Sequence, residues 1–211
     1  MSWFVTGTDT GVGKTWFCRL FLEALRKEKI DAVGYKPVCC GERTDAEQLA
    51  AVSGSLELDV VNPVWLKAPV APHVAAMLSG HAINPQALIA GCRALQEEHE
   101  SVVVEGAGGW RVPITEEYDM ADLATELGLP VIVVVANRLG ALNHTILTVE
   151  DIRASDLKVA GLVLNHLEEE LDTAAVTNKN LIEDLTEAPI LAEIIHGQDF
   201  IDLEPFVHAG V

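Results

Sequence analysis

The sequence predicts an α/β fold, in which a mostly parallel sheet is covered by helices on both faces. Two observations predict this fold. Short, continuous apolar segments recur along the chain and alternate with segments of helical periodicity. The first apolar segment also runs into a glycine-rich loop that opens a helix. With 211 residues, 49% of them hydrophobic, the chain can bury one large core, so we expect a single domain over residues 1–211.

Apolar patterning places the elements of the N-terminal half in order. We expect strands at Trp3–Val5 and Ala32–Tyr35, the second followed by a loop, and turns and prolines over residues 54–72. Helices are expected at Lys14–Glu28, whose apolar residues share one face, and at Thr44–Val52, Pro72–Leu78 and Pro85–Glu98. The helix at Thr44 is predicted to be capped by that threonine, with Glu47 three residues on.

The C-terminal half continues the alternation. We expect strands at Ser101–Val104, Pro130–Ala136, Val159–Leu164 and Ile190–Glu193, and helices at Met120–Leu127, Asn143–Ala154 and Thr173–Leu185. Continuous apolar strands separated by helices indicate parallel pairing. Ligands of such sheets bind at the carboxyl ends of the strands. The residues just after the strands are therefore expected to form one site: Thr10–Thr15, Lys36, Glu105, Asn137 and Asn165.

The glycine-rich loop has the pattern of a phosphate-binding loop. Gly11 and Gly13 precede Lys14 and Thr15, although the strict pattern would also need glycine in place of Thr8. Glycines let backbone N–H groups turn toward a polyphosphate, and the helix that follows presents its positive dipole end to the same anion. We therefore expect a nucleoside triphosphate, with Lys14 at its outer phosphates and Thr15 at the accompanying Mg2+.

Four further residues bear on this site, and three of them allow two interpretations each. Lys36 is either a surface lysine at a strand end or a phosphate or carboxylate contact. Asp45 is either a helix N-terminal acid or a metal ligand. Glu105 follows a buried strand, where many phosphate-loop proteins hold Mg2+, and with Thr15 and Asp45 it could supply three oxygen ligands. Trp110, after Gly108-Gly109, is either core or the wall of a pocket.

Composition excludes several classes of function. The net charge of −18 argues against nucleic acid or an anionic membrane as partner, because both need a basic surface. No apolar run reaches membrane-spanning length and no signal-peptide pattern begins the chain. The four cysteines lack metal-ligand spacing, and the seven histidines occur singly, so we expect neither disulfides nor a histidine metal site. A cytoplasmic protein is expected.

Several motifs together resemble the dethiobiotin synthetases. They are Val5-Thr6-Gly7-Thr8-Asp9-Thr10, Tyr35-Lys36-Pro37-Val38, Val104-Glu105-Gly106-Ala107-Gly108-Gly109-Trp110 and Leu139-Gly140-Ala141-Leu142-Asn143-His144. Asn62-Pro63 and Ala71-Pro72-His73 are similar to further stretches of that family. The resemblance runs from about residue 2 to about residue 197. It implies that 7,8-diaminononanoate, CO2 and ATP, with Mg2+, give dethiobiotin, ADP and phosphate.

The resemblance also implies the role of each matching residue. Catalytic roles fall to Thr10, Lys14 and Lys36, with Lys36 at the carbamate and the transferring phosphoryl group. ATP contacts are implied for Gly11, Val12, Gly13, Lys14, Thr15, Trp16, Asp45, Glu105, Gly106, Ala107, Gly108, Asn165, which would read the adenine edge, and Ile195. The diamine substrate would meet Thr10, Lys36, Cys40, Gly140, Ala141, Leu142 and Asn143, and the metal Thr15, Asp45 and Glu105. The sequence departs from the family at Gly11 and Cys40, where glutamate and a small hydroxyl residue are common.

The segment Gly140–His144 is expected to bind the substrate's tail carboxylate. It runs from a buried strand into a helix, so its backbone N–H groups make an anion site without a basic side chain. The alternative is a plain strand-to-helix connection. The resemblance implies a homodimer in which the partner chain completes the substrate site.

Two rival classes share the expected sheet. ATP-switch proteins of the partition, septum-positioning or nitrogenase-iron-protein kind carry an early lysine in the loop, where this chain has Asp9. They also often end in a membrane-binding tail, whereas this chain has Asp202-Leu203-Glu204-Pro205 near its end. A glutamine-dependent amidoligase would need a glutaminase domain, for which 211 residues leave no room.

Overall fold

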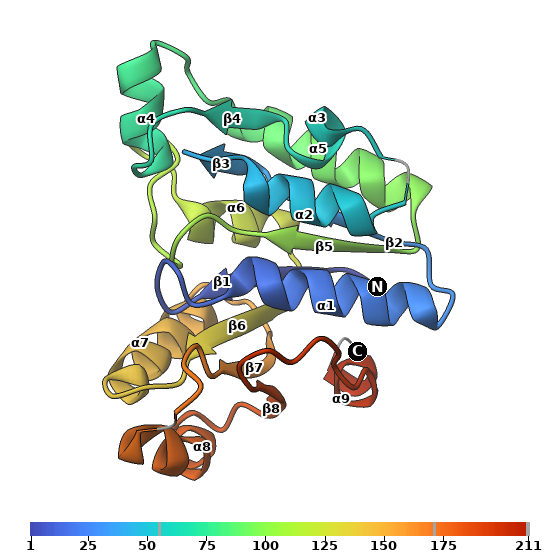
Figure 1. Cartoon of the computed structure of the whole chain (residues 1–211). Helices are drawn as coiled ribbons and strands as arrows, with labels where there is room; N and C mark the ends of the chain where they lie inside the picture. The colour runs from blue at the N-terminus through green and yellow to red at the C-terminus, as the bar shows by residue number, and fades with distance from the viewer. Residues whose placement is uncertain (55, 171, 210–211) are drawn as a thin grey trace.

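A parallel sheet forms the centre of the molecule (Figure 1). The computed structural model describes residues 1–54, 56–170 and 172–209. Within these ranges six strands pair in parallel in the order β2-β5-β1-β6-β7-β8. Their bounds are β1 (Trp3–Gly7), β2 (Ala32–Tyr35), β5 (Ser101–Glu105), β6 (Val131–Ala136), β7 (Val159–Asn165) and β8 (Ile190–Ile194). The predicted parallel sheet is confirmed, and β1 with its loop lies between β5 and β6.

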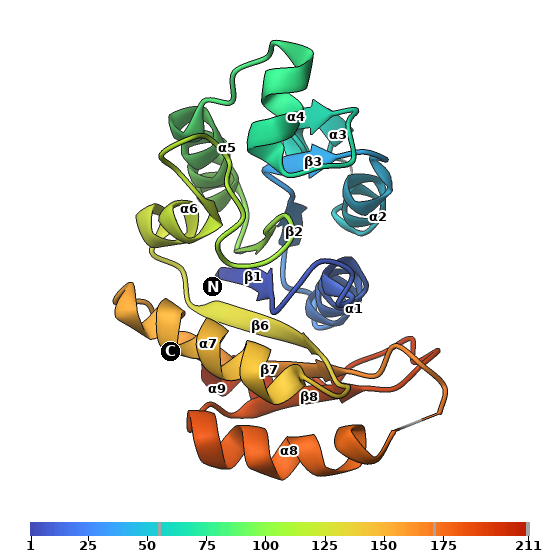
Figure 2. The same ribbon diagram turned by 90° about the vertical axis from the view of Figure 1, so that its left-hand side faces the viewer.

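Helices cover both faces of the sheet (Figure 2). One layer contains α1 (Lys14–Lys27), α2 (Thr44–Val52) and α9 (Glu204–Ala209), and the other α5 (Pro85–Glu98), α6 (Met120–Leu127) and α7 (Ala141–Ala154). The helix α8 (Thr173–Thr186) packs beside α7. Successive strand residues point to opposite layers: Phe4 joins the core under α5 and α6, and Val5 the core under α1. Because each of the two residues faces a buried layer, Phe4 and Val5 are both apolar.

The turn-rich prediction for residues 54–72 was wrong in part. The structure has α3 (Leu58–Val61) and β4 (Val64–Leu66) there, followed by α4 (Pro72–Ser79). The expected loop after Tyr35 contains β3 (Val38–Cys40), which pairs in parallel with β4 as a separate two-stranded sheet. Three-residue strands are too short to show a period in the sequence, so patterning could not detect them.

Some helix ends also differ from the predictions. The prediction that Thr44 caps α2 was wrong: Arg43 holds the cap position and no side chain caps the helix. The helix α7 begins two residues earlier than predicted, at Ala141, because Gly140 has a φ of 95° and takes the cap position. The helix α9, which patterning missed, packs its Phe206 against Phe17 and Phe21 of α1.

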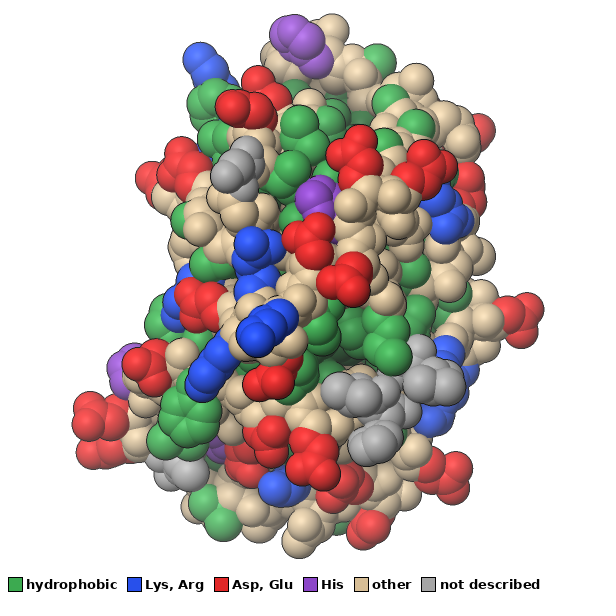
Figure 3. Space-filling view, turned by 90° about the vertical axis from the view of Figure 1, so that its right-hand side faces the viewer, with side chains coloured by type: hydrophobic (Ala, Val, Ile, Leu, Met, Phe, Trp, Pro, Cys, Tyr) green, Lys and Arg blue, Asp and Glu red, His purple; other side chains and the backbone are tan. Residues whose placement is uncertain are grey.

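The surface reflects the acidic composition. Figure 3 shows one face on which acidic side chains are scattered from end to end among fewer basic ones. Within the described ranges, the helices are too short or too polar to cross a membrane.

Candidate active site

The glycine-rich loop leaves β1 and leads into the first turn of α1 (Figure 1). Gly13, at the cap position, has a φ of 90°, and a Cβ added there would lie 2.0 Å from Nδ2 of Asn165. Only glycine fits both conditions. Lys14 is buried, and its Nζ donates to the backbone carbonyl of Asp9 at 3.0 Å, across the loop. The loop thus wraps around a lysine at the positive end of a helix, which is a site for phosphates.

Four predicted site residues meet at the carboxyl ends of β2 and β5. Nζ of Lys36 lies 2.5 Å from Oε1 of Glu105 and 3.0 Å from Oδ2 of Asp45. The hydroxyl of Thr15 donates to the same Glu105 oxygen at 2.8 Å. The interpretation of Lys36 as a surface lysine is wrong, because it is only 3% exposed.

The charges in this cluster shift the pKa of three groups. Burial alone would lower the pKa of Lys36, but the carboxylates of Glu105 and Asp45 outweigh burial and raise it. Burial would raise the pKa of Asp45, but the charge of Lys36 and its hydrogen bond lower it. Burial, and then the charge of Lys36, lower the pKa of Lys14 to about 8. The site thus holds one firmly charged lysine and one whose charge depends on its surroundings.

Oxygen atoms of the cluster fit a divalent cation. Oε2 of Glu105 is buried and has no hydrogen-bond partner among the described residues. The Thr15 hydroxyl, which bonds to the other oxygen of Glu105, and the Asp45 carboxylate lie in the same cluster. Carboxylate and hydroxyl oxygens are the ligands that Mg2+ prefers. In the same described ranges, no group of three or more histidines, cysteines or acids is placed to bind a metal. A metal here would therefore need oxygen atoms from a hydroxyl, phosphate or water in addition.

A cavity of about 400 Å3 adjoins the cluster on the side of the two-stranded sheet. It is lined by Thr10, Lys36, Val38, Cys39, Cys40, Asp45, Pro69, Val70, Ala71, Pro72, Ala107, Gly108 and Val112. Burial, and then the neighbouring Cys39, raise the pKa of Cys40 to about 11, so Cys40 presents a neutral thiol to the cavity. The carbonyl of Gly106 accepts a 3.4 Å hydrogen bond from Lys36, and Ala107 and Gly108, which follow it, line this cavity.

Asn165, which was predicted to read the adenine edge, ends β7, on the opposite side of β1 from β5 and β2, and the further predicted ATP contacts Ile195 and Trp16 lie at the surface. The side chain of Asn165 donates to the carbonyl of Val12 at 2.9 Å, so it braces the loop. Ile195, just after β8, is exposed. Trp16 is 37% exposed in the first turn of α1, with the guanidinium of Arg19 over its ring at 4.4 Å. Trp110 is buried and packs on Phe4, which favours the core interpretation, although it also borders a surface cavity.

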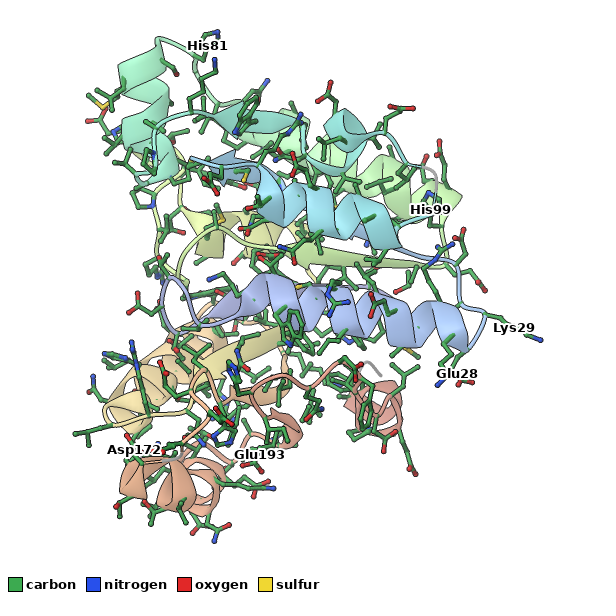
Figure 4. All side chains as sticks on the ribbon, viewed as in Figure 1. Glu28, Lys29, His81, His99, Asp172 and Glu193 are labelled. Atoms are coloured by element: carbon green, nitrogen blue, oxygen red, sulfur yellow. The ribbon has the colours of Figure 1, made fainter. Side chains whose placement is uncertain are left out.

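Residues 140–143 are not among the described residues that line the Lys36 cavity. Among the described residues, no hydrogen-bond acceptor meets the backbone N–H groups of Leu142 and Asn143, at the start of α7. Asp172, which Figure 4 labels near this end of the molecule, accepts from the N–H of Leu139 at 3.3 Å. The segment therefore has two free donors, but an acidic neighbour.

Sequence reasoning assigned no role to Asn62 and Arg43, which support the cluster. Asn62 is fully buried, and its side chain donates to the carbonyl of Lys36 at 2.7 Å. Arg43 donates to the Asn62 side chain at 2.9 Å. The one available signal was an asparagine followed by proline in a segment otherwise expected to be turns.

Comparisons with known proteins agree with this geometry. Residues 2–200 match the family described as "AAA domain". The complex of the cell division proteins MinC and MinD from Aquifex aeolicus aligns with a TM-score of 0.61, at 14% identity, over 99% of this chain and 86% of that chain. At that identity the likeness shows the fold alone. Fold and site together define a phosphate-loop protein that uses a nucleoside triphosphate.

The curated relatives are more specific. The ATP-dependent dethiobiotin synthetase BioD of Akkermansia muciniphila is 45% identical over 204 residues, which are 96% of this chain and 96% of that protein. That of Aromatoleum aromaticum is 42% identical over 204 residues, covering 92% of this chain and 90% of that protein. The chain belongs to the ATP-dependent dethiobiotin synthetase family, and it is accordingly an ATP-dependent ligase that forms carbon–nitrogen bonds.

Proposed function

We propose that the protein converts 7,8-diaminononanoate, CO2 and ATP to dethiobiotin, ADP and phosphate, with Mg2+. In this reaction one substrate amine captures CO2 as a carbamate. A carbamate oxygen then takes the γ-phosphoryl group of ATP, and the second amine attacks the carbamate carbon, closes the ureido ring and expels phosphate. Every covalent step is between substrates, so no protein nucleophile is needed.

The observation that carries the proposal is the position of Lys36. Its ammonium lies between the carboxylates of Glu105 and Asp45 at the floor of the 400 Å3 cavity, which also borders Thr10 of the phosphate loop. A cation at this boundary can contact both the phosphoryl group and its acceptor. Phosphoryl transfer chiefly needs such positioning and neutralisation of charge.

The two lysines take different parts in this scheme. Lys14 lies inside the loop at the end of α1, where it would bind the outer phosphates of ATP together with the backbone N–H groups. Lys36 lies on the acceptor side, where it would bind the carbamate oxygen and the phosphoryl group during transfer. Thr10 borders the same cavity and would orient the acceptor.

The oxygen atoms of Thr15, Asp45 and Glu105 would hold Mg2+. A metal ion bound there supplies positive charge to the β- and γ-phosphate oxygens. The unpartnered Oε2 of Glu105 supports this assignment, because a buried carboxylate oxygen without a partner is costly and a cation would satisfy it.

We also propose a homodimer in which Gly140–Asn143 of one chain binds the tail carboxylate of a substrate held by its partner. The unpaired N–H groups of Leu142 and Asn143 support this role. The segment lies outside the Lys36 cavity of its own chain, so a second chain would be needed to bring the two together.

A reducing, cytoplasmic setting is supported by the four cysteines, which are all free thiols.

A reconstituted reaction tests the proposal. Protein, ATP, Mg2+, bicarbonate and the diamine are mixed, and the ureido product is sought by mass spectrometry, with omission of each component as the control. We expect product and ADP in equal amounts only when all are present. ATP hydrolysis that is equally fast without the diamine would instead favour an ATP-switch protein, the alternative function.

A further inference from the structure

A single buried side chain joins the backbone of Lys36 to the segment that carries Asp45. The carboxamide of Asn62 donates from Nδ2 to the carbonyl of Lys36 at 2.7 Å and to that of Val64 at 3.0 Å. Its Oδ1 accepts from Nε of Arg43 at 2.9 Å. Both donor hydrogens and the acceptor oxygen are used, so this side chain has a defined orientation.

Lys36 depends on this contact because it lies beyond the end of the sheet. The strand β2 ends at Tyr35, and Pro37 provides no N–H with which the following backbone could pair. The Lys36 peptide is held instead by two neighbours: its N–H donates to the carbonyl of Val61 at 2.8 Å, and its carbonyl accepts from Asn62. Without the Asn62 side chain, only the hydrogen bond to the Val61 carbonyl would still hold the Lys36 peptide.

The other side of the carboxamide fixes the start of α2. Arg43 is the cap residue of that helix and Asp45 lies two residues further on, in the first turn. Besides its bond to the Asn62 side chain, Arg43 donates from Nη2 to the Asn62 carbonyl and to Asp59, each at 2.7 Å. Asn62 thus contacts the backbone of Lys36 directly and, through Arg43, the start of the helix that carries Asp45.

We propose that Asn62 is a positioning residue for the reaction: it sets where the Lys36 ammonium and the Asp45 carboxylate lie relative to the transferring phosphoryl group. This inference rests on the proposed function. A displacement of about 1 Å in such a site costs about 10²-fold in rate. Among the described residues, neither Asn62 nor Arg43 makes a hydrogen bond to residues 7–14 of the phosphate loop, so ATP affinity should stay within a few fold when Asn62 is altered.

A double-mutant cycle tests the proposal. Asn62→Ala is expected to lower single-turnover phosphoryl transfer about 10²-fold in the wild-type background. In a Lys36→Ala background the same change should cost much less, because the ammonium that Asn62 positions is gone and only the placement of Asp45 can still be disturbed. Equal losses in the two backgrounds would mean that Asn62 only stabilises the fold, and would overturn the proposal.

A matched control comes from Ser53, another buried polar residue next to β2. Its hydroxyl accepts from the N–H of Gly34 in β2 at 2.8 Å and donates to the carbonyl of Leu49 in α2 at 2.6 Å, and among the described residues its side chain makes no hydrogen bond to Lys36, Arg43 or Asp45. Ser53→Ala should lower the melting temperature and leave the rate per folded molecule unchanged in both backgrounds. If Asn62→Ala does not fold, Arg43→Gln enters the same cycle and should show the same dependence on Lys36.

The wild-type reaction separates failure of this inference from failure of the proposed function. If wild-type protein forms the ureido product and the cycle is additive, only the positioning role is refuted. If wild-type protein forms no product with all substrates present, the proposed function is refuted and the inference with it.

Discussion

The ammonium of Lys36 lies 2.5 Å from Oε1 of Glu105, with both side chains almost fully buried. The same oxygen accepts from the Thr15 hydroxyl at the start of the phosphate-binding helix. Glu105 therefore connects Lys36, at the cavity, to the helix that follows the glycine-rich loop. Because breaking a buried ion pair leaves an uncompensated charge, each partner should depend strongly on the other.

Removing either of the two site lysines should slow turnover strongly, by a different route in each case. Lys14→Ala should weaken ATP binding as well as the rate, because Lys14 lies within the phosphate loop. Lys36→Ala should lower the rate by about 10²–10³-fold and leave ATP affinity within a few fold. Calorimetric titration with ATP and single-turnover assays separate the two. Lys29→Ala, at the exposed far end of α1 (Figure 4), is the control and should change neither. Near-normal turnover by Lys36→Ala would remove Lys36 from the mechanism.

Two substitutions should move the Mg2+ requirement in opposite directions. Glu105→Gln keeps the shape of the side chain but removes its negative charge. The Mg2+ concentration for half-maximal activity should therefore rise about tenfold or more. Lys36→Met removes the cation that pairs with the same carboxylate. It should therefore tighten Mg2+ binding while slowing turnover. Mg2+ titrations of ATP binding and activity measure both, and unchanged curves for Glu105→Gln would make Glu105 purely structural.

ATP binding should weaken with rising pH. Burial and the charge of Lys36 lower the pKa of Lys14 to about 8, so the free protein loses this positive charge as pH rises through that value. Above it, ATP must bind a neutral lysine or first restore its proton, and affinity should fall by up to about tenfold per pH unit. Below this pKa Lys14 is protonated in the free protein, so its titration should no longer change ATP affinity. Equilibrium titrations with ATP across this range measure the slope.

Lys14→Arg is the matched variant for the pH experiment, because arginine keeps its charge throughout the range. Its ATP affinity should be lower but independent of pH. A wild-type profile that is as flat as that of Lys14→Arg would show that Lys14 remains charged in the free protein and would refute the prediction.

The start of α7 should affect the diamine and not ATP. Asn143→Pro removes one of the unpaired N–H groups in the first helical turn, where proline is tolerated. We expect a raised KM for the diamine with ATP affinity unchanged, since the tail carboxylate would lose a donor. Asn143→Ala, which keeps the N–H, is the control. Sedimentation at assay concentration checks the dimer, and an active monomer would refute a shared site.

The sequence predicted the local parts of the site better than its long-range supports. The loop and Lys14 were predictable because they follow a strand and open a helix, and Glu105 because it ends a buried strand. Asn62 acts only through the fold of residues 38–66, where the short strands β3 and β4 bring it under Lys36. Its own segment offers only the Asn62-Pro63 pair, which does not show that Asn62 contacts Lys36. The ligand roles of all the site residues stay predictions, including those of Cys40, Ile195 and Gly140–Asn143.

In the proposed reaction the site transfers the γ-phosphoryl group of ATP to a carbamate oxygen. The most direct measurement is a rapid single turnover with CO2 labelled with oxygen-18, followed by mass spectrometry of the released phosphate. Because ring closure breaks the bond between the carbamate carbon and the oxygen that bears phosphorus, the phosphate should carry one labelled oxygen. Phosphate without label, formed together with ADP, would mean that water is the acceptor, and would contradict the account.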